Sequence, residues 1–195
     1  MRHVEPTKLT MTITLPLLVK KAKACDLCEI GTRSKRRIIF RGDYPCDVLF
    51  VGEAAGDTEK VLGEPFVGPA GRLLDAMIEE ALPKAKCFFT NSIYCVPTDP
   101  NTRRLRAPLK SEVTSCNTHL RDIITITKPK AIVAVGNVGD GACKKAKCHD
   151  QFHYLKIMHP ASILRQEDSE LDYARTVHVL KELNSWLQKN RNRKT

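Results

Sequence analysis

The sequence predicts an α/β protein, a three-layer α/β/α sandwich around a mostly parallel central sheet. Short apolar runs rich in β-branched residues alternate along the chain with longer stretches of helical periodicity. The runs "DVLFVG" (47–52) and "AIVAVG" (131–136) are almost entirely apolar and end at glycine, which is typical of buried parallel strands. Strands that alternate with helices in this way form parallel sheets with helices packed on their faces.

The individual elements follow in order along the chain. Residues 1–15 and 189–195 carry no clear pattern, so we expect them to be loose ends. "KSEV" offers Ser111 as a candidate N-cap for the second of the expected helices. The expected strands cover residues 47–52, 87–95, 131–136 and 152–160, and the expected helices cover residues 70–82, 110–127 and 173–190.

Length and composition indicate one globular domain. The 195 residues are enough for a single domain over 1–195, with a core over about 20–188, and 42% of them are hydrophobic. No apolar run approaches the roughly 18 residues of a membrane span, and no cleavage pattern of a secretory signal is evident. We therefore expect a cytoplasmic protein, nucleoid-associated or in the cytoplasm of a viral host, that is not secreted.

The charge of the chain favours a polyanionic partner. The net charge is +10, and the basic residues gather in clusters. A single cluster is usually a solvated surface, but several in so short a chain favour nucleic acid, because basic side chains that neutralise phosphates release counterions. The clusters are "TRSKRRIIFR" (32–41), "RRLR" (103–106), "KKAK" (144–147) and the C-terminal "KNRNRK".

The cysteine content suggests a metal site or cluster. The chain has eight cysteines and no evident secretory signal. In a reducing compartment this usage points to metal or cluster ligation before disulfides.

A glycine-rich loop, Val51 to Asp75, directly follows the first expected strand. Its "GEAAG" matches neither a dinucleotide-binding turn nor a P-loop, and the carboxylates of Glu53 and Glu59 would repel a phosphate. Carboxylates here suit the positioning of a water or the stabilisation of positive charge. Phe66 lies on a stiff turn between proline and glycine, where it serves either core packing or base stacking.

Two polar side chains directly follow the apolar parts of other expected strands. Asn91 comes after "CFFT", and an amide that presents both a donor and an acceptor can read the edge of a base, or simply cap a turn. His159 follows the last strand, where a histidine can donate to an oxygen that becomes anionic, or serve the structure alone. Since ligands bind beyond the carboxyl ends of parallel strands, the loops after Val51, Thr90 and Met158 are expected to share one site.

Several motifs together resemble one enzyme family. "GEAAGDTEKVLGEPFVGPAGRLLD", "TNSIYC" and "HPASILR", with "CDLC" upstream, are similar in order and spacing to the motifs of the iron–sulfur (family four) uracil-DNA glycosylases. These belong to the uracil-DNA glycosylase superfamily, and the resemblance covers roughly residues 20–188. It implies a DNA repair enzyme that flips uracil out of DNA and hydrolyses its N-glycosidic bond, leaving an abasic site.

The resemblance also implies a [4Fe–4S] cluster that staples the fold. Its thiolate ligands would be Cys25, Cys28, Cys95 and Cys116, with a structural role and no redox turnover. Of the other cysteines, Cys46 and Cys87 are expected to be small buried residues. Cys143 and Cys148, with His149, are candidates for an accidental second metal site, which we consider the weaker interpretation.

Roles for the remaining motif residues follow from the same resemblance. Uracil would stack on Phe66, Asn91 would bond its O4 and N3–H edge, and His159 would stabilise the anionic O2. Glu53 and Glu59 are the candidates for holding the attacking water, with Glu53 the first choice. The tight backbone of Gly52, Ala54 and Gly56 would exclude the methyl group of thymine. Phosphate contacts are expected from Arg103, Arg104 and Arg106, and the loop with Ser162, Leu164 and Arg165 would enter the duplex.

The sequence departs from the family in two places. Ala55 stands where the family usually has proline, which loosens the turn. The segment 96–115 is longer than typical and resembles the arginine-rich loop of a covalent, uracil-trapping branch, but Leu105 stands about where that branch has its nucleophilic histidine. We therefore expect turnover, by a protein that acts as a monomer on single- or double-stranded DNA.

Other functions remain open at this stage. The chain could be a covalent or tight non-catalytic binder of uracil-DNA, or a polymerase-associated DNA-binding module that keeps the fold and the cluster. It could also be a zinc-stapled α/β protein that binds a nucleotide, because thiolates suit zinc as well as iron.

Overall fold

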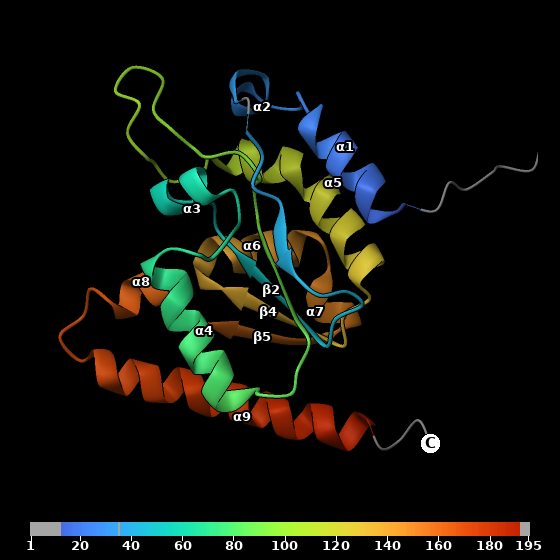
Figure 1. Ribbon diagram of the computed structural model, residues 1–195, viewed down its shortest axis with the longest axis vertical. Helices are drawn as coiled ribbons and strands as arrows, with labels where there is room; N and C mark the ends of the chain where they lie inside the picture. Colours follow the sequence, from blue (N-terminus) through green and yellow to red (C-terminus); the bar gives the residue numbers. More distant parts are fainter. Residues whose placement is uncertain (1–12, 35, 192–195) are drawn as a thin grey trace, which may run out of the picture.

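A five-stranded, mostly parallel sheet flanked by helices forms the centre of the molecule (Figure 1). The computed structural model describes residues 13–34 and 36–191. The strand order is β1-β3-β2-β4-β5, in which β1 pairs antiparallel with β3 and all other pairs are parallel. The expected α/β class and mostly parallel sheet are thus confirmed. The strands are β1 (Phe40–Gly42), β2 (Val48–Gly52), β3 (Cys87–Asn91), β4 (Ala131–Val135) and β5 (His153–Ile157).

Two hydrophobic clusters cover the two faces of the sheet. Successive side chains of a strand point to opposite faces, and β2 follows this rule, with Leu49 in one cluster and Phe50 in the other. The helices that bury residues against one face are α1 (Leu15–Lys23), α5 (Lys110–Thr127), α6 (Gly136–Lys145) and α7 (Cys148–Gln151). Those on the other face are α4 (Pro69–Ala81), α8 (Pro160–Ile163) and α9 (Ser169–Arg191), of which α4 and α9 pack together at the bottom of Figure 1.

Two further helices are short, and the first of them adds Ile30 to the same cluster as α1 and α5. The helix α2 (Glu29–Arg33) follows the "CDLC" motif, and α3 (Asp57–Leu62) follows β2 and buries none of its own residues. Figure 1 shows both beside the long loop that leaves β3 at the upper left. Within the described ranges, none of the helices is long and apolar enough to cross a lipid bilayer.

The sequence placed most of the central elements correctly. Helix α5 has the expected bounds, whereas α4 and α9 begin one and four residues earlier than expected, at Pro69 and Ser169. Ser111 is not the N-cap of α5. The cap residue is Leu109, and its backbone N–H donates to Glu112 Oε2 at 2.8 Å. Glu112 therefore stabilises the first turn, as acceptors near helix N-termini do.

Other boundaries differ from the expectation. The strands expected over 87–95 and 152–160 end at Asn91 and Ile157. After Asn91 the chain turns, and the backbone N–H of Ser92 donates to Gly52 O at 2.9 Å, across the end of β2. Residues 13–15 and 189–191 are not loose, since they adjoin α1 and complete α9; the rest of those expected ends lies outside the described residues.

Helix α6 was not expected, because "GNVGDGACKK" contains several glycines and few apolar residues. One of these glycines explains its position. A Cβ at Gly139 would overlap the carbonyl of Val51, so a larger residue would push α6 away from the end of β2. This close approach places the start of α6 beside the loop that follows β2.

Candidate active site and cysteine cavity

A pocket of about 870 Å³ opens at the carboxyl ends of β2, β4 and β5. Glu53 and Ala54 line it from the loop after β2, Gly136 and Asn137 from the start of α6, and His159 from the loop after β5. The predicted meeting of the loops that follow Val51 and Met158 is therefore observed. This is the edge of a parallel sheet at which ligands usually bind.

The third loop reaches this site through Gly52. A Cβ on Gly52 would overlap both the ring of Phe66 and Oδ1 of Asn91, so these two side chains converge on the same backbone atoms. Phe66 has a φ of 60° and packs against Phe89, with the ring centroids 5.8 Å apart. Phe66 and Asn91 are only 7% and 3% exposed. Neither side chain lines the pocket itself. We call these two buried side chains against Gly52 the inner end of the site, and the pocket lined by Glu53 and His159 its outer part.

His159 is oriented by the backbone around it. Its Nδ1 accepts a hydrogen bond from the Ala161 N–H at 3.2 Å, so in the neutral ring the proton is on Nε2. Burial lowers the pKa of His159, the charge of Arg165 lowers it further, and Glu59 opposes the shift. A Cβ on Gly136 would lie only 3.0 Å from Cβ of His159, so glycine is needed for the two loops to meet. The result is a neutral imidazole whose Nε2–H is available as a donor.

The two candidate carboxylates are in different situations. Glu59 is bonded to the loop itself: its Oε1 accepts from Gly68 N–H at 2.7 Å and its Oε2 from Gly56 N–H at 3.1 Å. Glu53 lines the pocket, and desolvation by burial raises its pKa. A carboxylate with a raised pKa that faces a pocket is suited to accept a proton, whereas Glu59 holds the backbone of the turn.

The loop after β5 presents residues of two kinds. Ser162 and Arg165 line the pocket, and Arg165 Nη2 lies 3.5 Å from Ser162 Oγ. Leu164 is 51% exposed, whereas its neighbour Ile163 is in the core. Leu164 is therefore an exposed apolar side chain at the C-terminal end of α8, and Met158, which lines the pocket, is another at the end of β5.

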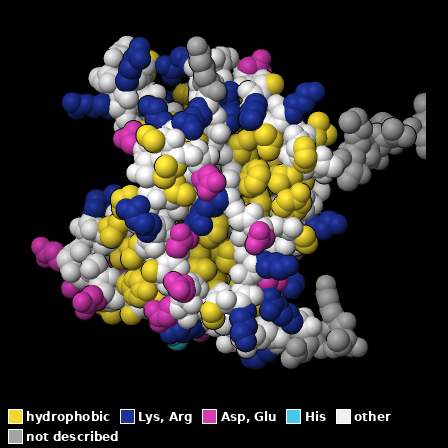
Figure 2. Space-filling model, in the orientation of Figure 1, with side chains coloured by type: hydrophobic (Ala, Val, Ile, Leu, Met, Phe, Trp, Pro, Cys, Tyr) yellow, Lys and Arg dark blue, Asp and Glu magenta, His cyan; other side chains and the backbone are white. Residues whose placement is uncertain are grey.

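The arginines of the long loop after β3 are also divided. Arg103 and Arg104 are exposed, at the turn of a hairpin closed by a bridge between Thr98 and Leu105. Arg106 instead donates to both carboxylate oxygens of the buried Glu112, at 2.9 and 2.6 Å. Its hydrogen bonds lower the pKa of Glu112, so Arg106 anchors the loop to α5. Figure 2 shows lysine and arginine side chains along this upper edge of the molecule.

The cysteines of the "CDLC" motif lie in a second cavity, at the end of the molecule that carries α1, α2 and α5. The four cysteines predicted as cluster ligands all line it: Cys25, Cys28, Cys95 and Cys116. Burial raises the pKa of Cys95 to about 11 and that of Cys116 to about 12, and the charge of Arg37 opposes the rise at Cys95. Cys95 and Cys116 are buried, whereas Cys25 and Cys28 are partly exposed.

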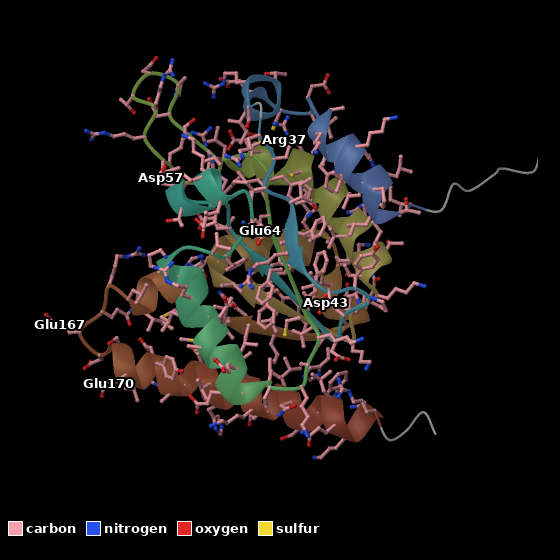
Figure 3. All side chains as sticks on the ribbon, in the orientation of Figure 1. Arg37, Asp43, Asp57, Glu64, Glu167 and Glu170 are labelled. Carbon is pink, nitrogen blue, oxygen red and sulfur yellow. The ribbon has the colours of Figure 1, made fainter. Side chains whose placement is uncertain are left out.

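Arg37 holds the loop that carries Cys25 and Cys28. Its Nη2 donates to the carbonyl oxygens of Cys25 and Gly31, both at 2.7 Å, and its Nε donates to Ala22 O at 3.1 Å. A further bond reaches the Ser34 carbonyl. The prediction that the basic cluster 32–41 faces a polyanion is therefore wrong for Arg37, which points into the protein between α2 and α5 (Figure 3).

His119 is a residue of this cavity that the sequence analysis missed. It lies on α5, one turn after Cys116, and its ring stacks on Tyr94 with the centroids 5.4 Å apart. It is 1% exposed, and neither ring nitrogen has a hydrogen-bond partner. The i, i+3 spacing from Cys116 was the available signal, because residues at this spacing share a helix face.

The donor set of this cavity, four cysteine thiols, fits a metal–sulfur cluster by its chemistry. Among residues 13–34 and 36–191, no group of three or more His, Cys, Asp and Glu side chains is arranged to hold one metal ion. A cluster contains several iron and sulfur atoms, so its ligands stand farther apart than those of one ion. Four converging thiols beside an unpartnered histidine are consistent with such a group.

The other cysteines show no second site. Cys143 and Cys148 are both buried, whereas His149 is at the surface with its Nε2 3.2 Å from Asp150. In the part of the chain that the structure describes, the three do not form a metal site. Cys46 is buried as expected, and Cys87 is partly exposed.

Comparisons with known proteins match most of the chain. The family model for the uracil-DNA glycosylase superfamily matches residues 40–188. A type-4 uracil-DNA glycosylase from Pyrobaculum aerophilum is 32% identical over 164 residues, which are 74% of this chain and 81% of the relative. Type-4 enzymes from Saccharolobus solfataricus and Sulfurisphaera tokodaii are 32% and 35% identical, each over 63% of this chain. The chain spans about half the length of these two, 55% and 54%.

Proposed function

Because the chain belongs to the uracil-DNA glycosylase superfamily, we propose that its pocket removes uracil from DNA. The protein is a uracil-DNA glycosylase, a hydrolase of DNA repair that leaves an abasic site. The observation that carries this proposal is that Glu53 and His159, from loops about a hundred residues apart in sequence, line one pocket beside Gly52, on which Phe66 and Asn91 converge. A carboxylate, an imidazole donor, an aromatic ring and an amide are the groups that excision of a pyrimidine requires.

The inner end of the site recognises the base. Uracil stacks on Phe66, and the amide of Asn91 bonds its O4 and N3–H edge. Cytosine reverses the donor and acceptor at this edge, and each polar group left unpaired costs about 1–3 kcal/mol. The backbone of Gly52, Ala54 and Gly56 lies where thymine would place its methyl group, and the bond from Gly56 to Glu59 supports the rigidity of this turn.

The outer part of the site breaks the glycosidic bond. Water attacks C1′ of the deoxyribose, and the bonding pair of C1′–N1 leaves with uracil, whose negative charge is shared with O2. His159 donates its Nε2–H to O2, and Glu53 accepts a proton from the water and balances the positive charge of the sugar. The raised pKa of Glu53 supports its role as the base, and the two backbone bonds of Glu59 support a positioning role for that residue.

DNA is held from both sides of the pocket. Arg103 and Arg104 contact phosphates, and Arg106 positions the loop that carries them. The hydrogen bonds from Arg106 to Glu112 support this positioning role. Leu164 enters the gap that the flipped nucleotide leaves, with Ser162 and Arg165 beside it. The protein acts as a single domain and a monomer, on single- or double-stranded DNA. Leu105 stands about where the covalent, uracil-trapping branch has its nucleophilic histidine. Because leucine cannot act as a nucleophile, it favours turnover over a lasting bond to DNA.

The second cavity holds a [4Fe–4S] cluster through Cys25, Cys28, Cys95 and Cys116. When bound, the cluster supplies iron–sulfur bonds that tie the α1–α2 loop to the segment after β3 and to α5. The lining of one cavity by these four side chains supports this assignment. Arg37 orients the loop of the first two ligands through its bonds to carbonyl oxygens.

One incubation tests the activity. The protein is mixed with oligonucleotides that carry a single uracil, single- and double-stranded, and alkali then cleaves at abasic sites. We expect cleavage at the uracil and none in matched oligonucleotides with thymine or cytosine. Intact uracil strands from a protein with its iron in place would contradict the proposal. A protein–DNA band that survives a denaturing gel would identify a covalent binder instead.

A further inference from the structure

The buried ring of His119 has no role in the activity proposed above. It is 1% exposed, and both Nδ1 and Nε2 lack hydrogen-bond partners. A buried polar group without a partner costs about 1–3 kcal/mol. Such a group is expected to have a partner that the polypeptide alone does not supply.

Sulfur is the most frequent side-chain acceptor around His119, because four cysteines line this cavity and the lining side chains that carry oxygen are Glu112, Ser115 and Tyr94. The ring lines the cavity of the four cysteines, and its stacking on Tyr94 restricts its orientation. The carboxylate of Glu112, which also lines this cavity, already accepts from Arg106 and from Leu109 N–H. Much of the remaining wall is apolar, including Ala22, Ile30 and Ile93.

We propose that His119 donates one ring N–H to a sulfur atom of the iron–sulfur cluster and thereby raises the reduction potential of the cluster. The inference rests on the cluster proposed above. Reduction adds negative charge to the cluster, and a donor at sulfur stabilises the more negative state, so hydrogen bonds to sulfur raise the potential. His119 is in this sense a positioning and tuning residue, and it does not touch the DNA site.

The test compares variants that differ in the donor alone. His119→Phe keeps a flat ring for stacking on Tyr94 and removes the N–H, whereas His119→Gln restores an N–H donor. The matched control is His178→Phe, because His178 is exposed on α9, far from the cysteines in sequence. Each protein is purified without oxygen, its iron and sulfide are measured, and the midpoint potential of the cluster is determined by spectroelectrochemical titration.

We expect a lower potential in His119→Phe. At the wild-type midpoint the ratio of reduced to oxidised cluster should fall about tenfold, which is about 59 mV for a one-electron couple. His119→Gln should recover part of this shift, and His178→Phe should leave the potential unchanged. An unchanged potential in a His119→Phe protein with full iron content would overturn the inference.

A second measurement needs no variant and so does not depend on folding. Wild-type protein labelled with ¹⁵N-histidine is reduced and examined by pulsed electron–nuclear resonance. A weak coupling between the cluster spin and a histidine nitrogen is expected, and its absence would contradict the hydrogen bond. Failure of the proposed function is distinguishable, because a protein without iron and sulfide refutes the cluster itself, and inactivity on uracil-DNA refutes the glycosylase with the cluster unaffected.

Discussion

The active-site pocket and the cysteine cavity are completed by different means. Around the pocket, the groups that position the loops are bonded within the protein: Glu59 bonds Gly56 and Gly68, and His159 accepts from Ala161 N–H. Around the cysteine cavity, the two ring nitrogens of the buried His119 have no hydrogen-bond partner. The polypeptide thus shapes the pocket by its own hydrogen bonds, whereas the cavity is where we propose an iron–sulfur cluster. Changes to the two regions should therefore affect different measurements.

The largest effect on stability is expected from removing a proposed cluster ligand, which should change the cysteine cavity and not the pocket. Cys116→Ser leaves a weaker ligand in the cavity, so the iron content should fall. The free energy of unfolding should decrease by about 4 kcal/mol, which is the loss expected for a ligand present at about 1,000 times its dissociation constant. Iron analysis and denaturant titration measure both. The matched control Cys46→Ser changes another buried cysteine outside the cavity and should keep its iron. Equal losses in the two variants would contradict the assignment of Cys116.

The next effect is on activity alone. Glu53→Gln keeps the shape of the side chain but removes the base, so the rate of uracil release should fall about 10²–10⁴-fold, measured as single-turnover cleavage. The iron content should not change. Glu167→Gln, on the exposed connection between α8 and α9 (Figure 3), is the control and should keep full activity. A fast Glu53→Gln enzyme would shift the role of base to another group.

The pH dependence of stability and rate, compared between wild type and Glu53→Gln, tests the same role of Glu53. Burial raises the pKa of Glu53 in the folded protein, so the folded state binds more protons than the unfolded state between the two pKa values. The contribution of Glu53 to stability is therefore present at pH below its unfolded pKa and lost as the pH rises through the folded pKa. Over the same interval the wild-type rate should rise with pH. Glu53→Gln should lose both dependences in parallel denaturant and rate titrations.

A smaller effect is expected at Arg37. This variant tests whether the hydrogen bonds of Arg37 order the loop of the cysteine cavity before a cluster binds. Arg37→Leu leaves several carbonyl oxygens without a donor, so the free energy of unfolding should fall by about 3 kcal/mol. The matched change Arg36→Leu removes a neighbouring exposed arginine that bonds only Lys60 O among the described residues. It should weaken DNA binding more than folding. Equal stability of the two variants would mean that the cluster alone orders the loop.

The smallest effect is expected at Leu164. Leu164→Ala removes an exposed side chain, so stability should stay within about 0.5 kcal/mol of wild type. Activity on double-stranded uracil-DNA should fall about tenfold, equivalent to about 1.4 kcal/mol in the barrier, because nothing fills the vacated stack. Activity on single strands, which have no such stack to fill, should change little. An equal loss on both substrates would argue against insertion into the duplex.

The sequence predicted those elements whose pattern is local. Helix α5 was placed at its observed bounds because its apolar residues repeat at helical spacing over eighteen residues. Helix α6 was not predicted, because its position depends on the close approach of Gly139 to β2. A local sequence pattern does not indicate such a contact. The edge strand β1 covers only Phe40–Gly42 and owes its existence to pairing with β3.

The same distinction holds for the candidate site. The positions after strand ends identified Glu53, Asn91 and His159, because the carboxyl edge of a parallel sheet follows from topology. The difference between Glu53 and Glu59 depends on where Gly68 lies in space, which a sequence does not give. The basic clusters were misleading for the same reason: Arg37 and Arg106 look like surface charges in the sequence, yet both point to internal partners.

The bonds of Glu59 have a consequence for motion. Gly56 precedes α3 and Gly68 precedes α4, so one carboxylate joins the starts of both helices. Since α4 packs on α9, a shift in this outer layer would reach the turn beside the pocket through the two hydrogen bonds of Glu59. Substrate selectivity and the tightness of the α4–α9 contact should therefore vary together when either is altered.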